Sequence, residues 1–226
     1  MIVTAGPLEE PAGRLLTALS KRGHAVCEAG EQPAGDGPVT LAVSSGAFVF
    51  NLAGLVQSIA PRHFRILMLS RLGVHPDARA TSLQRLWRLE EHVRGAGAPA
   101  LTLRFAPLLG EDSPMWRQLR QAGSLPRGGR QLLNPVLESD AMETLVRAIE
   151  DPAPWSGWYE VAGPEVWSLA ELRDAAAATA GPRTGAAWEP SLEELSEHRL
   201  AEAEPWASRF GIQPGSIAGF AKQCAA

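Results

Sequence analysis

The sequence predicts an α/β fold, in which a mostly parallel sheet is covered by helices on both faces. Short apolar runs typical of buried strands alternate with stretches of helical spacing through the first half of the chain. Glycine and proline residues separate these stretches, as turn-forming residues do between regular elements. The chain has 226 residues, 45% of them hydrophobic, and is therefore long enough to bury one sizeable core.

The first half alternates strands and helices. Strands are predicted at Met1–Ala5, His24–Ala29, Val39–Val43, Phe64–Leu69 and Ala100–Phe105. Helices are predicted around Leu15, Leu16 and Leu19, ending at Lys21-Arg22-Gly23, then over Ala47–Ala60 before Pro61, and over Thr81–Arg94. A Pro/Gly/Asp loop is expected over Glu31–Pro38. This alternation favours βαβ units, and hence parallel strands.

Apolar spacing on the helix at Thr81–Arg94 indicates which face meets the sheet. Leu86, Leu89 and Val93 follow helical spacing and are expected to be buried. Glu90 and Glu91 are expected on the opposite, solvent-exposed side.

The second half is less regular. A strand is predicted at Gln131–Leu137 and another at Trp158–Val161, with helices at Ser113–Gln121, Asp140–Glu150, Ser168–Ala180 and after Pro214. Ser139 or Asp140 is expected to cap the second of these helices. Ser168 with Glu171 forms a capping-box pattern at the start of the third. We predict a single domain over 1–226, with a core of 1–112 plus 131–162 and a small C-terminal lobe over 163–226.

Composition excludes several classes of partner. The net charge is -4 and the sequence has no basic run of five, so we expect neither nucleic acid nor a membrane surface as partner. No segment reaches the roughly 18 apolar residues of a membrane span. Two cysteines, Cys27 and Cys224, are too few for a disulfide framework or a metal cluster. A reducing cytoplasm is the expected location.

Collinear segments of the chain resemble a known family. "GRLLTALSKRGHAV", "RILMLSRLGVHPDA", "LEEHVRGAGAPALTLRFAPLLG", "NPVLESDAMETLVRAIEDP", "WYEVAGPEVWSLAEL" and "FGIQPGSIAGFA" occur in this order. They resemble the extended and atypical short-chain dehydrogenase/reductases, which include NmrA-like and NAD-dependent epimerase/dehydratase-like proteins. This resemblance implies a Rossmann-type sheet that binds NAD or NADP. The fold expected here is a reduced version of that sheet, with helices on both faces and a small C-terminal lobe.

The first strand–helix turn departs from the family's Gly-x-x-Gly-x-x-Gly loop. Gly13 aligns with the last glycine, and Gly6 lies one position out of register with the first. Pro7 and Glu10 occupy the positions of the first two glycines. Proline removes a backbone donor, and a carboxylate repels the pyrophosphate that a helix N-terminus would otherwise attract. The same residues suit a helix start that needs no ligand.

The adenine half of the nucleotide site is expected to be shortened. Only about nine residues separate the second strand from the third, where a Rossmann half normally holds a helix, a strand and another helix. Glu31 follows the second strand, where a carboxylate would bind a ribose hydroxyl. Ser45 follows the third strand. Gly6, Gly13, Glu31 and Ser45 are therefore the candidate cofactor-binding residues, although a solvated charge is the alternative for Glu31.

The family's catalytic pair is missing. Its chemistry needs a tyrosine with a lysine four residues later on one helix face, because the lysine lowers the pKa of the tyrosine. The resemblance places the pair at Ser82 and Leu86. Tyr159 is the only tyrosine, Gly163 lies four residues after it, and no Tyr-x-x-x-Lys occurs in the sequence. We therefore assign no catalytic residue.

Other candidates gather where the strands of the predicted sheet end. Ser70 and Arg71 end the most apolar strand, His75 follows shortly after, and Arg104 and Pro107 lie at the end of the next strand. In open α/β sheets, ligands bind at the carboxyl ends of strands. These five residues are the predicted ligand cleft. Strand-end capping for Ser70 and support of the following turn for Arg104 are the structural alternatives.

Two function classes follow. The favoured hypothesis is a relative without redox catalysis that binds a small molecule or a protein partner in a regulatory or accessory role. It expects no cofactor, and a homo-oligomer is compatible with it. The alternative is an NAD(P)-dependent oxidoreductase or a sugar-nucleotide epimerase/dehydratase with relocated catalytic residues. A cofactor-free isomerase or hydratase built on Ser70, His75 and Arg104 is a third hypothesis.

Overall fold

The computed structural model describes residues 2–4, 12–28, 39–44, 63–179 and 190–225. Their contacts gather into two units. The first comprises Met1–Arg104 and Leu145–Tyr159, and the second comprises Phe105–Thr144 and Glu160–Ala226. The predicted division into a core and a lobe that begins at residue 163 stays a prediction. Within the described ranges, no helix is long and apolar enough to cross a membrane.

The first unit is built on a parallel sheet. Its strands, ordered β2-β1-β3-β4-β5-β9, are β1 (Ile2–Thr4), β2 (Val26–Glu28), β3 (Val39–Val43), β4 (Phe64–Arg71), β5 (Ala100–Phe105) and β9 (Trp158–Val161). β1 pairs in parallel with both β2 and β3, and β3 pairs in parallel with β4. The predicted parallel α/β sheet is therefore confirmed.

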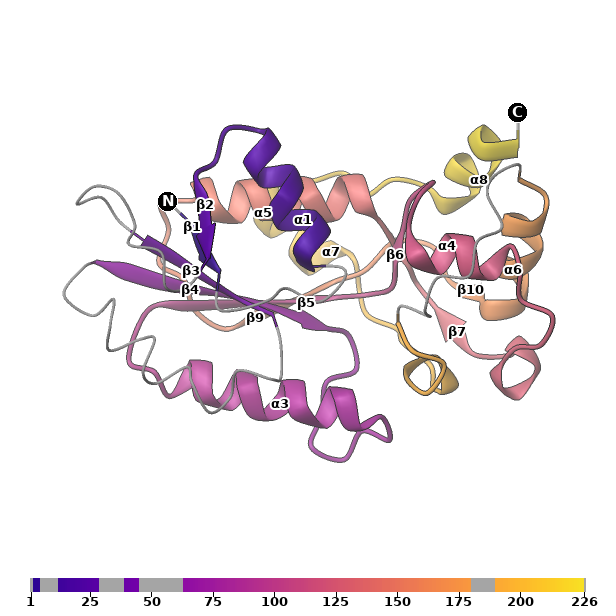
Figure 1. Ribbon diagram of the computed structural model, residues 1–226, viewed down its shortest axis with the longest axis horizontal. Helices are drawn as coiled ribbons and strands as arrows, with labels where there is room; N and C mark the ends of the chain where they lie inside the picture. The colour runs from indigo at the N-terminus through magenta and orange to yellow at the C-terminus, as the bar shows by residue number, and fades with distance from the viewer. Residues whose placement is uncertain (1, 5–11, 29–38, 45–62, 180–189, 226) are drawn as a thin grey trace. The chain divides into compact units, whose positions relative to one another are not determined.

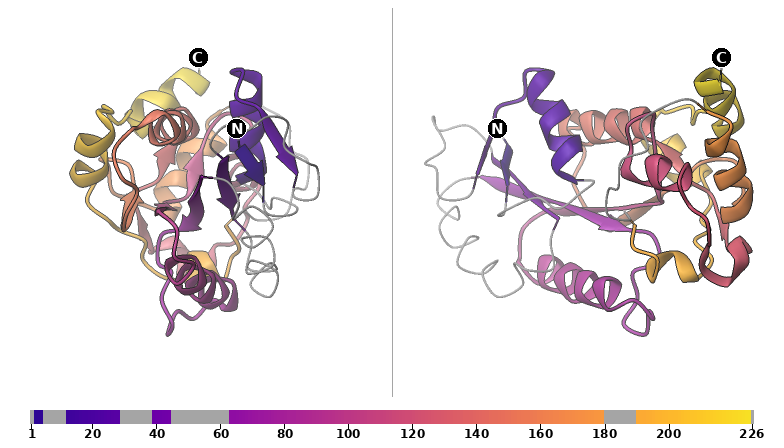
Figure 2. Two further views of the ribbon diagram at one scale, coloured as in Figure 1. Left: turned by 90° about the vertical axis from the view of Figure 1, so that its left-hand side faces the viewer. Right: turned by 45° about the vertical axis from the view of Figure 1, so that its right-hand side comes forward.

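Helices lie on both faces of this sheet. α1 (Ala12–Lys21) and α3 (Thr81–Arg94) cover opposite faces, as both Figure 1 and Figure 2 show. The end of α5 (Glu138–Glu150) lies on the same side as α1. A buried cluster that includes Leu41, Met68, Leu83 and Leu89 fills the space between β3, β4 and α3. Burial of this apolar face is the main term that holds α3 on the sheet.

The second unit combines short strands with helices. β6 (Leu108–Leu109) pairs in parallel with β8 (Val136–Leu137), and β7 (Leu132–Leu133) pairs antiparallel with β10 (Trp167–Ser168). Its helices are α4 (Pro114–Leu119), α6 (Leu169–Ala177), α7 (Glu204–Phe210) and α8 (Ile217–Ala225), with 3-10 turns at Pro126–Gly129 and Glu194–Ser196. Trp116, Leu133, Leu172 and Ile217 are among its buried core residues.

Several predicted elements match the structure in both bounds. The strands at Val39–Val43, Ala100–Phe105 and Trp158–Val161 and the helix at Thr81–Arg94 have the predicted ends. The capping box at Ser168 is present, because its side chain accepts from the Glu171 N–H while the Glu171 side chain accepts from the Ser168 N–H. The helix predicted at Ala47–Ala60 and the loop over Glu31–Pro38 lie outside the described residues.

The strand predicted over Gln131–Leu137 is wrong. Two separate strands, β7 and β8, occupy this stretch and pair with different partners. Asn134-Pro135 separates them, and proline cannot donate to a strand ladder. The Asn134 side chain instead donates to the carbonyls of Gly163 and Ala201 and accepts from the Ala201 N–H.

Candidate functional site

A buried polar cluster lies near the carboxyl ends of β4 and β5. The Ser70 hydroxyl donates to Glu90 Oε1 over 2.7 Å. The Arg104 guanidinium donates to both oxygens of the same carboxylate, at 3.1 Å from Nε and 2.6 Å from Nη2. All three side chains are at least nine-tenths buried. Such a two-pronged arginine–carboxylate pair is among the stronger polar contacts in proteins.

The burial of Glu90 corrects the expectation that it faces solvent. Glu90 is 2% exposed, although Glu91 beside it is exposed. Its position is four residues after Leu86 and three before Val93, so helical spacing places it on the buried face. The carboxylate tolerates burial because Arg104 balances its charge and Ser70 hydrogen-bonds it. The sequence signal for this buried pair was Arg104, a charged residue in the otherwise uncharged strand β5.

The remaining predicted cleft residues have different surroundings. Arg71 ends β4 and is half-buried. His75 is exposed, accepts at Nδ1 from the Asp77 N–H, and lies with its ring 6.0 Å from that of Trp87. Pro107 belongs to the second unit, where its carbonyl accepts from the Val136 N–H. The structure therefore brings Ser70 and Arg104 together through Glu90.

Arg104 also contacts an aromatic ring. Its guanidinium carbon lies 5.0 Å from the centre of the Trp158 ring, and Trp158 is 52% exposed on β9. The Arg104 guanidinium is therefore held both by its hydrogen bonds to Glu90 and by this cation–π contact with Trp158. With Ser70 donating to a carboxylate and Arg104 neutralised by it, the geometry favours the structural roles over the cofactor-free isomerase hypothesis.

The sheet order locates the place where a Rossmann fold binds its ligand. β1 lies between β2 and β3, so the chain runs outward to β2 on one side and to β3 and β4 on the other. Ligands meet open α/β sheets outside the carboxyl ends of strands at such a switch point. Ser44 directly follows β3 there and is half-buried, and its hydroxyl oxygen has no hydrogen-bond partner among the residues that the structure describes.

Three of the four candidate cofactor residues, Gly6, Glu31 and Ser45, lie outside the described residues. Gly13 is the second residue of α1, and its carbonyl accepts from the Thr17 hydroxyl at 2.8 Å.

The two positions that the resemblance assigns to the catalytic pair lie on α3. Ser82 is half-buried, while Leu86 is 6% exposed and belongs to the apolar cluster that also contains Val43 and Met68. A lysine ammonium at Leu86 would have to leave water among these apolar groups, which is costly without a partner. The structure therefore favours an apolar side chain at position 86.

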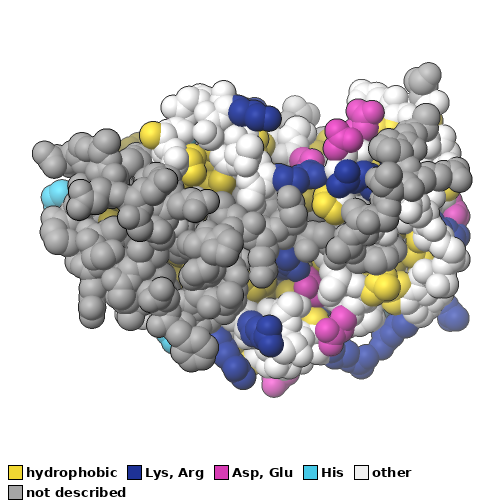
Figure 3. All heavy atoms as spheres, viewed as in Figure 1, with side chains coloured by type: hydrophobic (Ala, Val, Ile, Leu, Met, Phe, Trp, Pro, Cys, Tyr) yellow, Lys and Arg dark blue, Asp and Glu magenta, His cyan; other side chains and the backbone are white. Residues whose placement is uncertain are grey.

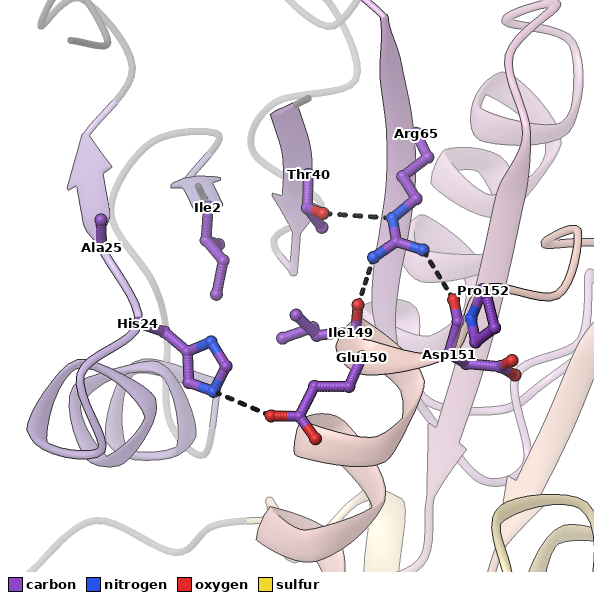
Figure 4. A pocket seen from close by; sticks show the side chains of 9 residues that line it. All are labelled: Ile2, His24, Ala25, Thr40, Arg65, Ile149, Glu150, Asp151 and Pro152. Carbon is purple, nitrogen blue, oxygen red and sulfur yellow. Dashed lines mark hydrogen bonds and ion pairs between the residues drawn. The ribbon is translucent and has the colours of Figure 1, made fainter. Parts of the chain in front are cut away.

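A pocket of about 470 Å³ lies at the opposite, amino end of the sheet. Figure 4 shows the Arg65 guanidinium at one side and His24 facing Glu150 at another, with Nε2 of His24 3.9 Å from the carboxylate. Arg65 donates to the Thr40 hydroxyl and to the carbonyls of Ile149 and Asp151. Ile149 lies in the last turn of α5, and Asp151 directly follows that helix. Arg65 therefore caps the C-terminal end of α5.

Sequence reasoning missed the role of Arg65. Burial lowers the pKa of its guanidinium from the usual value, and the charge of Asp151 partly offsets that effect. The guanidinium carbon also lies 3.9 Å from the centre of the Trp155 ring. An arginine at the start of an otherwise apolar strand was the available signal, because such a charge needs partners on a neighbouring element.

Acidic and basic side chains are interspersed on the face shown in Figure 3. Across the residues with assigned positions, no group of three histidine, cysteine, aspartate or glutamate side chains could hold a metal ion.

The chain was compared with known proteins. No protein-family model and no curated protein matches its sequence. Solved structures match its fold. MoeE5 in complex with UDP-glucuronic acid and NAD superposes with a TM-score of 0.71 at 14% identity, covering 99% of this chain and 96% of that chain. The chain therefore has a Rossmann fold.

Two further structures have the same likeness. TunA, an NAD-dependent NDP-hexosamine 5,6-dehydratase of tunicamycin biosynthesis, gives a TM-score of 0.67 at 15% identity, with 99% and 96% of the two chains covered. UDP-glucose 4-epimerase from Thermotoga maritima, with UDP-glucose, gives 0.62 at 13% identity, with 99% and 97% covered. The expected resemblance to the extended dehydrogenase/reductases is confirmed at the level of fold.

Proposed function

We propose that this chain is a non-redox relative of the NAD-dependent epimerases and dehydratases, acting as a small-molecule-binding, regulatory or accessory protein. The observation that carries the proposal is the identity of two residues on α3. Its two positions for a catalytic pair hold Ser82 and the core residue Leu86, and the only tyrosine of the chain lies on β9. Without a tyrosine and a nearby lysine, the family's proton transfer has no donor at this helix.

The nucleotide-binding half supports the same proposal. β2 is the terminal strand of the six-stranded sheet, and only ten residues separate it from β3. The sequence of the first turn carries Pro7, Glu9 and Glu10 where backbone N–H groups should approach a pyrophosphate. A dinucleotide would therefore lose both its phosphate cradle and much of its adenine pocket, and the proposal expects no bound cofactor.

Calorimetric titration with NAD, NADH, NADP and NADPH tests this proposal. We expect no heat of binding in the micromolar range. UDP-glucose and UDP-glucuronic acid serve as ligand probes in the same instrument, because the fold neighbours hold these molecules. Micromolar binding of any of the four dinucleotides would overturn the proposal.

The fold likeness itself favours a second candidate function, an NAD(P)-dependent oxidoreductase or sugar-nucleotide epimerase/dehydratase with relocated catalytic groups. It rests on alignment over 99% of this chain with structures that hold NAD. This candidate requires dinucleotide binding and turnover of a nucleotide sugar. Incubation of the chain with NAD and UDP-glucose, followed by chromatography of the sugar nucleotides, separates it from the first.

The location and partners of the chain belong to the proposal as well. A cytoplasmic setting suits a chain with two cysteines far apart in sequence, because disulfide-rich scaffolds belong to oxidising compartments. A protein partner or a second copy of the chain is compatible with an accessory role. Size-exclusion chromatography with light scattering measures the oligomeric state directly.

A further inference from the structure

Three arginines are buried among the residues that the structure describes, Arg104, Arg120 and Arg199, and each is at most 8% exposed. Two of them pair with a carboxylate. Arg104 pairs with Glu90, as described above, and Arg199 Nη2 lies 3.3 Å from Glu197 Oε2. An arginine keeps its charge throughout the ordinary pH range, so its burial without a counter-charge is costly. Arg120 is the exception to this pairing.

Arg120 directly follows α4 in the second unit, and within the described ranges it has no carboxylate partner. Its Nε donates to the Thr179 hydroxyl at 2.8 Å, and that hydroxyl donates in turn to the Ala176 carbonyl. Its Nη2 is buried and makes no hydrogen bond. Thr179 therefore orients the guanidinium but, being neutral, does not balance its charge. The C-terminal end of α4 contributes only a partial negative charge.

A second arginine without a counter-ion lies one turn earlier. Arg117 is half-buried, its Nε is buried without a hydrogen-bond partner, and its side chain forms no ion pair with the part of the chain that the structure describes. Arg120 keeps helical backbone angles, with φ −57° and ψ −25°, so these two side chains, three residues apart, lie on one face of the helix. Two guanidinium groups therefore share a face, and no carboxylate pairs with either.

The carboxylate of Glu111 lies in the same neighbourhood but does not neutralise this pair. Burial raises the pKa of the Cys224 thiol on α8, the charge of Glu111 raises it further, and the charge of Arg120 partly offsets both effects. Both charges therefore act on one thiol. Glu111 is nevertheless exposed and forms no ion pair with Arg117 or Arg120. The two guanidinium groups remain open to an anion from solution.

Two guanidinium groups on one face suit a phosphate group. Arginine donates in a fork that matches the oxygen atoms of phosphate, and two positive charges balance the charge of a phosphate dianion, whereas a carboxylate balances only one of them. From the buried Arg120 without a counter-ion and Arg117 on the same face, we propose that the end of α4 binds a phosphate group, either free phosphate or that of a small metabolite. Arg117 is half-buried and gives access from solvent. This inference does not rest on the proposed function.

Inorganic phosphate and glycerol 3-phosphate at millimolar concentration are the probes, and acetate is the control anion. Ionic strength is held constant, because salt screens charges. Binding is followed by two-dimensional ¹H–¹⁵N NMR of the Nε–Hε signals of Arg117 and Arg120. We expect saturable shifts with at least one phosphate probe, and the tighter of the two shows whether the site takes free or esterified phosphate. No saturable shift with either probe, or equally tight binding of acetate, refutes the inference.

Matched variants separate a phosphate site from a general effect of the anion. In urea unfolding of the natural chain, phosphate at about ten times its Kd should raise the folded-to-unfolded ratio about tenfold. Arg120→Met removes the buried charge and should lose this response, whereas Arg130→Met, at an exposed position of the same unit, should keep it. Arg117→Gln serves as the second variant if Arg120→Met does not fold, because its side chain has no hydrogen bond or ion pair to lose. An unchanged phosphate response in Arg120→Met or Arg117→Gln places the anion elsewhere and contradicts the inference, as does loss of the response in Arg130→Met.

Discussion

Replacing Glu90 by glutamine tests whether the buried cluster at the end of β4 and β5 is a structural ion pair. Glutamine keeps the shape of the side chain and removes its charge. The Arg104 guanidinium, 7% exposed, would then lose the counter-charge that Glu90 supplies. Removal of one partner from a buried pair typically costs about 3–5 kcal/mol. Against a total stability of about 5–15 kcal/mol, we expect a loss of about 3 kcal/mol.

The assay is urea unfolding followed by tryptophan fluorescence. Three variants complete the test: Arg104→Met, the double variant Glu90→Gln/Arg104→Met, and Ser70→Ala. The two partners contact each other, so the double variant should lose less than the sum of the single losses, with a coupling of at least about 2 kcal/mol. Ser70→Ala removes one hydrogen bond to a charged group and should cost about 1.5 kcal/mol. A loss below about 1 kcal/mol in Glu90→Gln would refute the ion-pair reasoning.

Three further predictions concern the second unit. Burial raises the pKa of Glu165, but hydrogen bonds from Ser216, Trp167 and the N–H groups of Ala218 and Ile217 outweigh this effect and hold the pKa below its usual 4.5. The stabilisation from the ionised Glu165 carboxylate is therefore present above pH 4.5 and is lost as the pH falls through the folded-state pKa. The difference in unfolding free energy between the natural chain and Glu165→Gln should consequently shrink in acid. Gly163→Ala would bring a Cβ within 2.0 Å of the Pro135 carbonyl, and we expect a loss of about 3 kcal/mol. Gly123→Ala meets nothing within 4 Å and should be neutral or stabilising in the same unfolding assay, so equal effects at the two glycines would contradict the packing argument. Ser168→Ala removes the cap of α6 and should cost about 1 kcal/mol, measured as a shift of the urea midpoint, with an unchanged midpoint as the contrary result.

Elements with strong local signals could be predicted from the sequence. β3 is a short, mostly apolar run after Pro38, and α3 combines helical spacing with a glycine at its end, so both bounds of each element were predictable. β7 and β8 could not be separated by periodicity, because each has two residues and is defined by its partner on another element. α7 was missed for a similar reason, since its seven residues are too short for periodic spacing.

The candidate sites were predictable only in part. Ser70 and Arg104 were identified because they end neighbouring strands, but their link through Glu90 is a contact between α3 and the sheet. The pocket that contains Arg65 combines residues far apart in sequence. No local pattern indicates which strand end or helix end will lie beside it.

The sequence by itself determined that the tyrosine–lysine pair is absent, because a count of residue types does not depend on folding. It also determined the alternation of strands and helices, which follows from apolar spacing along the chain. Only the tertiary structure decided that Glu90 is a buried counter-ion and that Arg65 caps the end of α5. Burial and charge pairing are properties of surfaces brought together by folding, and one segment of sequence holds only one of those surfaces.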